Sequence, residues 1–253
     1  MIKRWINYCL VGLAGGGVGG MLGVGGGIIM VPLLTWLGVT QKRAQGTSLS
    51  ATIPLAVVSA ASYYHAGCIN FQAALPLAAG GVIGAYIGSG FVRYLSNRLL
   101  YRLFGMMLVI LAARHAFTVL TSTAAGQAAG TFPLLALLAG VAAGFVSGFF
   151  GVGGGVIFVP TGVQFLSLNE KSAHGSSFIA IIPTAIIGLI RYYRAGDIQR
   201  DVVLPLIVGA IVGGLAGANI AVGVADVPLA LIFSAFLGIV GIRRLVGKNP
   251  QGK

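Results

Sequence analysis

The residues best suited to bind a ligand are two glycine runs, because glycine leaves backbone amides open to a bound group. Each run reads Gly-Val-Gly-Gly-Gly, at 23–27 and 151–155, and Val-Pro follows each of them. Glycine weakens a helix interior by about 1 kcal/mol relative to alanine and readily adopts positive φ, so we expect a helix break at each run. A helix that starts after such a break presents unpaired N–H groups and a positive dipole end, and both favour an anion. The expected ligand groups are Gly25, Gly26, Gly27, Gly153, Gly154 and Gly155.

Hydroxyl side chains follow both glycine runs at equivalent positions. Thr47 and Ser48 in the first half correspond to Ser176 and Ser177 in the second half. These hydroxyls either cap the N-terminus of the next helix or donate hydrogen bonds to the oxygen atoms of an anion. We include all four among the candidate substrate-binding residues.

Gln45 and His174 occupy equivalent positions before these hydroxyls and complete the polar part of the candidate site. His174 is either a hydrogen-bonded structural residue or a ligand donor or proton carrier. The acidic residues lie in or beside expected loops, so we expect no buried carboxylate and an anion flux that the membrane potential drives. These acids are Glu170, Asp197, Asp201 and Asp226.

Three arginines are further candidates. Arg191 and Arg194 flank Tyr192-Tyr193 at the end of an apolar run. They either anchor that end at the membrane interface or capture the substrate, and we include Arg191 in the candidate site. Arg114 lies just inside another apolar run, and a charged side chain within a membrane is costly enough to suggest a function.

The composition requires a membrane around these residues. Of the 253 residues 57% are hydrophobic and only 8% are charged, with a net charge of +12. An ordinary soluble domain has about 25% charged residues, so this chain could not cover a water-facing surface. The cations lie in small clusters between apolar runs rather than on one basic face, which argues against nucleic-acid binding. Cys9 and Cys68 have no metal-ligand spacing, and we expect no metal and no cofactor.

The apolar runs predict an all-α polytopic protein with about eight transmembrane segments. Most runs are near the ~20 residues with which a helix crosses the bilayer, and strand-like alternation is absent. The first run has an internal counterpart, so we do not expect it to be a cleaved leader. The runs span residues 5–37, 47–64, 73–92, 99–120, 132–168, 175–190, 202–224 and 228–247.

The sequence is an internal duplication of a four-segment unit. The match extends from the glycine runs through Pro54 and Pro183 to Leu75-Pro76 and Leu204-Pro205. We therefore divide the chain into a first transmembrane repeat, 1–125, and a second, 126–253. Other glycines recur every fourth residue in both repeats, and small residues at this spacing let helices pack closely. These stripes are Gly12, Gly16 and Gly20 with Gly140, Gly144 and Gly148, and Gly80, Gly84 and Gly88 with Gly209, Gly213 and Gly217.

The distribution of cations favours inverted repeats. If the first segment of each repeat is broken or re-entrant, Arg114 and Lys171 are the only two of the 16 Lys and Arg residues on the outer side. This arrangement obeys the positive-inside rule far better than eight complete crossings do. It places both termini in the cytoplasm.

These elements together resemble the sulfite exporter TauE/SafE family. The resemblance rests on the paired glycine runs with Val-Pro, on Gly46-Thr47-Ser48 with Pro54, and on Gly175-Ser176-Ser177 with Pro183. It implies a secondary transporter that moves a small anion, typically sulfite or an organosulfonate, out of a bacterial cell, and we therefore expect it in the inner membrane. The two-fold repeat with interrupted helices favours alternating access, in which one repeat rocks against the other. The family motif does not name the anion.

Other classes of function fit the residues less well. Paired catalytic carboxylates, a metal cluster, a nucleophile triad and a Gly-Lys-Ser/Thr phosphate loop are all missing from the sequence, so we do not expect an enzyme. An anion channel, or a transporter of a small metabolite without sulfur, is the alternative. The sequence leaves open the coupling ion and whether the protein is a monomer or a homodimer.

Overall fold

The computed structural model describes residues 2–91, 97–121, 133–150 and 154–246, and in these residues the chain forms helices joined by short loops. The predicted all-α class is therefore confirmed for the described residues. In chain order the helices are α1 (Ile2–Leu22), α2 (Gly27–Trp36), α3 (Gln41–His65), α4 (Phe71–Phe91), α5 (Asn97–Thr121), α6 (Pro133–Phe150), α7 (Gly155–Phe165), α8 (Glu170–Arg194), α9 (Arg200–Gly223) and α10 (Asp226–Val246).

Many of these helices are suited to a bilayer. Five described helices are long and apolar enough to cross a membrane, and shorter apolar helices accompany them. Each of the eight apolar runs contains at least one helix, and the two long runs are each divided in two. Large apolar side chains such as Ile110, Leu204 and Ile239 are exposed on the outer surface, as lipid-facing positions require. The five spans are Arg4–Leu22, Phe71–Gly88, Glu170–Arg194, Arg200–Gly223 and Asp226–Arg243.

The order of the helices repeats. The helices form two sets, α1 to α5 and α6 to α10. In each set the first helix is followed by a short helix after the glycine run and then by a helix of 25 residues. The predicted boundary between residues 125 and 126 lies outside the described residues.

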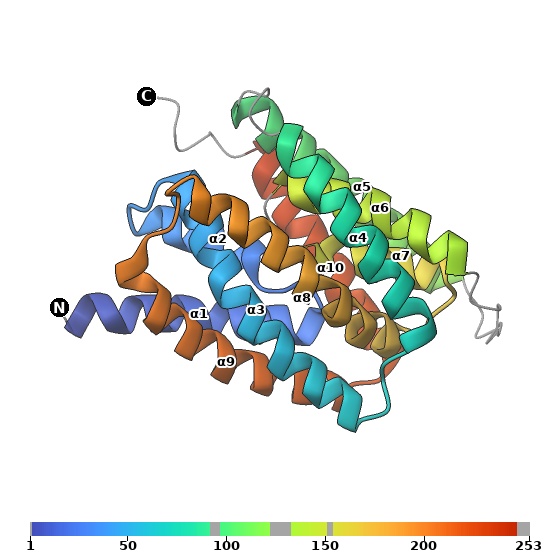
Figure 1. Ribbon diagram of the computed structural model, residues 1–253. Coiled ribbons are helices and arrows are strands. Elements are labelled where there is room, and N and C mark those ends of the chain that lie inside the picture. The colour runs from blue at the N-terminus through green and yellow to red at the C-terminus, as the bar shows by residue number, and fades with distance from the viewer. Residues whose placement is uncertain (1, 92–96, 122–132, 151–153, 247–253) are drawn as a thin grey trace.

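The equivalent helices α3 and α8 lie side by side at the centre and run antiparallel (Figure 1). Gly46 near the start of α3 faces Tyr192 near the end of α8, and Gly175 near the start of α8 faces Tyr63. This pair positions both sets of candidate polar residues.

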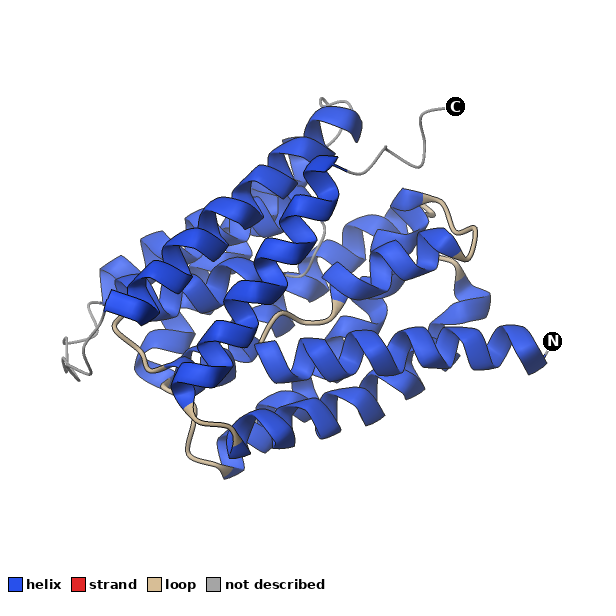
Figure 2. Cartoon of the chain, turned by 180° about the vertical axis from the view of Figure 1, so that it is seen from behind, coloured by secondary structure: helices blue, strands red, loops and turns tan. Residues whose placement is uncertain are grey.

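The two halves interlock around this central pair. Helix α1 packs on α9, and α4 packs on α6, so each of these contacts joins the first half to the second (Figures 1 and 2). Helices α5 and α10 form a further pair across the halves.

The predicted glycine stripes form the α1–α9 and α4–α6 contacts. A Cβ atom at any stripe position would collide with backbone atoms of the facing helix; at Gly16, for example, it would meet Ala210, and at Gly144 it would meet Gly81. The prediction that these glycines serve close packing is confirmed. The full set is Gly12, Gly16, Gly20, Gly80, Gly84, Gly88, Gly140, Gly144, Gly148, Gly209, Gly213 and Gly217.

We predict that Gly16→Ala destabilises the protein whereas Gly17→Ala does not. An added Cβ at Gly16 meets the α9 backbone at Ala210, but at Gly17 it reaches only an ordinary contact of 3.9 Å. Overpacking costs about 1–3 kcal/mol, while alanine favours a helix over glycine by about 1 kcal/mol. Thermal unfolding in detergent should show a lower midpoint for Gly16→Ala alone. Equal midpoints for the two variants would contradict close packing at this contact.

Candidate functional site

The first predicted helix break is present between α1 and α2. Gly23, Gly25 and Gly26 adopt φ values of +67°, +76° and +74°, which other L-residues rarely tolerate. The chain reverses there, since Gly19 lies against Gly26 and α2 returns alongside α1. Residues 22–28 are buried, so protein surrounds the break.

The second break lies before α7 and touches the first. Gly154 has a φ of +91° and immediately precedes α7. A Cβ atom at Gly155 would meet the carbonyl oxygen of Gly23 and the Cα atom of Val24. The structure thus brings Gly25, Gly26, Gly27, Gly154 and Gly155 into one region of the protein, while Gly153 lies outside the described residues.

The carbonyl groups of the first break are hydrogen-bonded by side chains of α3 and α8. Such bonds are needed because a buried carbonyl without a partner costs free energy. The bonds run from Tyr63 Oη to Met21 O (3.0 Å), from His174 Nδ1 to Met21 O (3.1 Å), from Ser177 Oγ to Gly23 O (2.8 Å) and from Thr52 Oγ1 to Gly25 O (2.7 Å).

The amide groups of the same break differ from its carbonyls. In the described part of the chain, the N–H groups of residues 25–28 have no hydrogen-bond acceptor, and the first bonded amides of α2 are those of Ile29 and Met30, both to Gly26 O. The first amides of a helix lack partners within the helix. The break therefore offers donors and few acceptors, which suits an anion rather than a cation.

The hydroxyl groups predicted near the break divide into different roles. Thr47 Oγ1 accepts the N–H of Gln199 at 3.0 Å, and Ser176 Oγ accepts the N–H of Asn70 at 3.0 Å, so each holds the loop after the opposite central helix. Ser48 Oγ donates to Gln45 O at 2.9 Å. Ser177, described above, is the one of the four that bonds a carbonyl of the glycine run in the described structure.

The capping alternative for these hydroxyls was wrong. The N-cap residues of α3 and α8 are Thr40 and Asn169, and Asn169 accepts the N–H of Ser172. The four hydroxyls lie about two turns further along each helix, beyond the amides that need a cap. Gln45, in the same part of α3, accepts a hydrogen bond from Tyr192 Oη at 3.0 Å.

The structure does not bring the arginines to the break. Arg191 lies over the ring of Tyr86 on α4, 4.6 Å from its centroid. It is about 21 Å along α8 from Ser177 at 1.5 Å per residue. Arg114 is exposed and lies 5.3 Å from the centroid of Phe165, and Arg194 is exposed at the end of α8.

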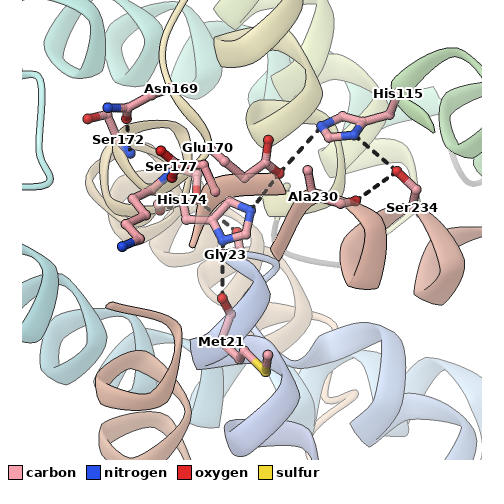
Figure 3. Close-up of polar contacts among 12 residues, drawn as sticks. Met21, Gly23, His115, Asn169, Glu170, Ser172, His174, Ser177, Ala230 and Ser234 are labelled. Carbon is pink, nitrogen blue, oxygen red and sulfur yellow. Dashed lines mark hydrogen bonds and ion pairs between the residues drawn. The ribbon is translucent and has the colours of Figure 1, made fainter. Parts of the chain in front are cut away.

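Glu170 corrects the expectation that no carboxylate is buried. It is the first residue of α8, yet it is only 4% exposed. Its Oε1 lies 3.1 Å from Nε2 of His174 and 3.5 Å from Nε2 of His115, which comes from α5 (Figure 3). The i, i+4 spacing of Glu170 and His174 places them on one helix face and was the available sequence signal. Among the described residues, no group of three His, Cys, Asp or Glu is arranged to hold a metal ion.

Comparison with known proteins identifies the family. The family profile described as Sulfite exporter TauE/SafE matches residues 8–244. The chain belongs to the sulfite exporter TauE/SafE family. Both glycine breaks and Glu170 lie within the matched region, so the site is part of the TauE/SafE fold rather than of an appended segment.

The relatives of this TauE/SafE chain are named as transporters. A probable membrane transporter protein of Xylella fastidiosa is 31% identical, with 82% of each chain covered. Another of Methanocaldococcus jannaschii is 28% identical, with 94% of each chain covered. Sulfite exporter TauE/SafE family protein 3 of Arabidopsis thaliana is 37% identical over 37% of this chain and 20% of its own. No solved structure matches. This TauE/SafE protein is a membrane transporter and not an enzyme.

We predict that Ser177→Ala loosens the break in this TauE/SafE protein. Ser177 Oγ donates to the carbonyl of Gly23, which lies in the break between α1 and α2. Ser50 serves as the control, because its Oγ donates to Thr47 O within its own helix. Loss of a partner for a buried polar group costs about 1–3 kcal/mol. Amide hydrogen exchange of Val24, Ile29 and Met30, whose N–H groups are hydrogen-bonded on either side of the break, should be faster in Ser177→Ala and nearly unchanged in Ser50→Ala when followed by mass spectrometry. Equal protection in both variants would show that Ser177 does not hold the break.

Proposed function

We propose that the protein is a secondary transporter that exports a small anion, sulfite or an organosulfonate, by alternating access. The observation that carries the proposal is the asymmetry of the α1–α2 break. Side chains hydrogen-bond its carbonyls, but in the described structure the amides of residues 25–28 have no acceptor. An anion would satisfy these amides, and broken helices bind anionic groups in this way in other transporters.

The positions of the two short helices favour one shared anion. The start of α7 at Gly155 touches the first break, so the positive ends of α2 and α7 lie near each other. Sulfite and sulfonate groups each carry three oxygen atoms that can accept from several N–H groups at once. The family description and the name of the Arabidopsis relative both refer to sulfite export. We propose Gly25, Gly26, Gly27 and Ser177 as the residues nearest the anion.

Burial of the break implies movement during transport. Residues 22–28 are enclosed by protein, so an anion reaches them only after neighbouring helices separate. The antiparallel pair α3 and α8 supports inverted repeats, in which rocking of one repeat against the other opens the site to alternate sides.

The cations support the proposed orientation. Lys171 at the start of α8 and Arg194 at its end are separated by about 35 Å. Arg114 lies at the Lys171 end, because its neighbour His115 approaches Glu170. We therefore propose that this end faces outward and that both termini are cytoplasmic, in a bacterial inner membrane.

We predict that sulfur oxyanions stabilise the purified protein. Thermal unfolding in detergent would be measured with sulfite, isethionate, sulfate, acetate and chloride at matched ionic strength. A ligand at 100 times its Kd stabilises the folded state by about 2.7 kcal/mol, so sulfite or isethionate should raise the midpoint in a saturable way. Stabilisation by acetate or chloride without any by the sulfur compounds would overturn the proposed substrate.

Counterflow in proteoliposomes tests the mechanism of transport. We expect external unlabelled isethionate to accelerate efflux of labelled isethionate, because a carrier returns faster when it is loaded. A channel would show no such acceleration and no saturation. That result would favour the alternative of an anion channel.

We predict that Gly25→Ala greatly reduces isethionate transport, whereas Gly38→Ala does not. Both glycines have positive φ, +76° and +88°, so alanine introduces a similar backbone strain at each. A Cβ at Gly25 meets Thr52 Cγ2 at 3.0 Å, but at Gly38, in the loop after α2, it meets nothing within 4 Å. We expect at least about a tenfold loss for Gly25→Ala, equivalent to about 1.4 kcal/mol. Equal transport by both variants would exclude the α1–α2 break from the transport site.

A further inference from the structure

Three buried side chains from two helices meet beside the first break. Glu170 and His174 belong to α8 and His115 belongs to α5, and both histidines are 0% exposed. The ring of Phe233 packs against both imidazoles, with centroid distances of 5.2 Å to His115 and 5.5 Å to His174. Figure 3 shows both Nε2 atoms directed at the same carboxylate oxygen, Oε1 of Glu170.

The hydrogen bonds of His174 determine where its proton lies. Its Nδ1 is 3.1 Å from the carbonyl oxygen of Met21, which can only accept a hydrogen bond. Nδ1 therefore carries a hydrogen, and in a neutral imidazole Nε2 is then an acceptor. Nε2 lies 3.1 Å from Oε1 of Glu170, so two acceptors would face each other unless a proton lies between them.

The same reasoning applies to His115. Its Nδ1 is 3.1 Å from Ser234 Oγ, and the single hydrogen of that hydroxyl is donated to Ala230 O at 2.9 Å. Ser234 must therefore accept from His115 Nδ1–H. Nε2 of His115 is buried and has no hydrogen-bond partner within the described residues, although Glu170 Oε1 is only 3.5 Å away. Because Nδ1 carries the hydrogen of the neutral ring, the lone pair of this Nε2 is the position at which His115 could hold a second proton.

The charge of the cluster follows from these positions. With one proton held between Glu170 and His174, the cluster is neutral, because a carboxylate offsets an imidazolium. A second proton on His115 Nε2 makes the cluster positive. A buried positive charge is costly unless an anion lies nearby, so proton binding and anion binding favour each other.

The other charged and titratable groups nearby do not compensate the cluster. Lys171 donates through Nζ to Val222 O at 2.8 Å, and its N–H bonds to Asp226 on α10. Arg114 on α5 is exposed against an aromatic ring. Tyr63 on α3 bonds to Met21 O and meets His174 edge to face at 6.5 Å.

The cluster is also connected to the break itself. His174 Nδ1 donates to Met21 O at the end of α1, and the single hydroxyl hydrogen of Ser177 is shared between His174 O at 2.7 Å and Gly23 O at 2.8 Å. A change of charge on the cluster thus acts on the backbone that we propose to hold the anion. In the first repeat Gln41 and Gln45 occupy the positions of Glu170 and His174, so only the second repeat has this acid and base.

We propose that His115, Glu170 and His174 form a proton-coupling site, which takes up a second proton with each anion and releases it with the anion on the other side. The inference rests on the proposed anion site. The proton forms the Nε2–H bond of His115 when the anion enters, and this bond breaks when the anion leaves. Transport of a monoanion with one proton moves no net charge, in contrast to the voltage-driven flux expected from the sequence.

Proteoliposomes loaded with isethionate test this coupling. Isethionate remains a monoanion over the pH range used, and potassium with valinomycin holds the voltage at zero. Efflux through the unaltered protein should make the interior alkaline, with about one proton lost per anion, and a change of voltage should leave the efflux unchanged. Efflux without internal alkalinisation would overturn the coupling but leave anion transport standing. No efflux at all would refute the proposed function and this inference together.

Glu170→Gln and Asp226→Asn provide a matched pair of variants. Glu170→Gln removes the carboxylate shared by the histidines and copies the first repeat, while Asp226→Asn neutralises an acid outside the cluster. We expect Glu170→Gln to lose proton-coupled efflux but to retain isethionate exchange, which needs no net proton movement, and Asp226→Asn to retain both. Retained proton coupling in Glu170→Gln would overturn the proposal. So would loss of exchange together with coupling in a variant whose thermal unfolding midpoint is unchanged.

Discussion

The structure depends on hydrogen bonds to the buried carbonyl and amide groups of the backbone. Where α1 ends, buried carbonyl and amide groups lose their hydrogen-bond partners within the helix, and each buried group without a partner costs free energy. The carbonyls of the break accept hydrogen bonds from the side chains of Tyr63, His174, Ser177 and Thr52. These four side chains come from α3 and α8, so the central pair supplies the hydrogen bonds that the carbonyls of the first break need.

The rest of the fold holds that central pair in place. Glycine stripes bring α1 against α9 and α4 against α6, so that two helix pairs flank α3 and α8. Close contact over small residues supplies packing where lipid provides little hydrophobic drive between helices. The glycine stripes therefore fix the α1–α9 and α4–α6 pairs, while the glycine runs create the irregular backbone between the helices.

Much of this arrangement could be predicted from the sequence, because glycine spacing and the duplication are local or periodic signals. The breaks, the stripes and the helical class all follow from them. The surroundings of Glu170 could not be predicted from the sequence, since an acid at the edge of an apolar run resembles a loop residue. Its carboxylate approaches His115, which lies on a different helix, and both histidines of the cluster pack against Phe233 further along the chain. The i, i+4 spacing of Glu170 and His174 is a local signal, but no local pattern predicts the contacts with His115 and Phe233. The partners of the hydroxyls were unpredictable for the same reason.

The pairing of α1 with α9 has a consequence for how the protein is made. Helix α1 (Ile2–Leu22) is synthesised long before α9 (Arg200–Gly223), on whose backbone its glycine stripe packs. The stripe of α1 therefore lacks its partner helix while the chain from α2 to α8 is synthesised. Close packing of α1 can be completed only after α9 has been synthesised, so an early helix depends on a much later one for its final contacts.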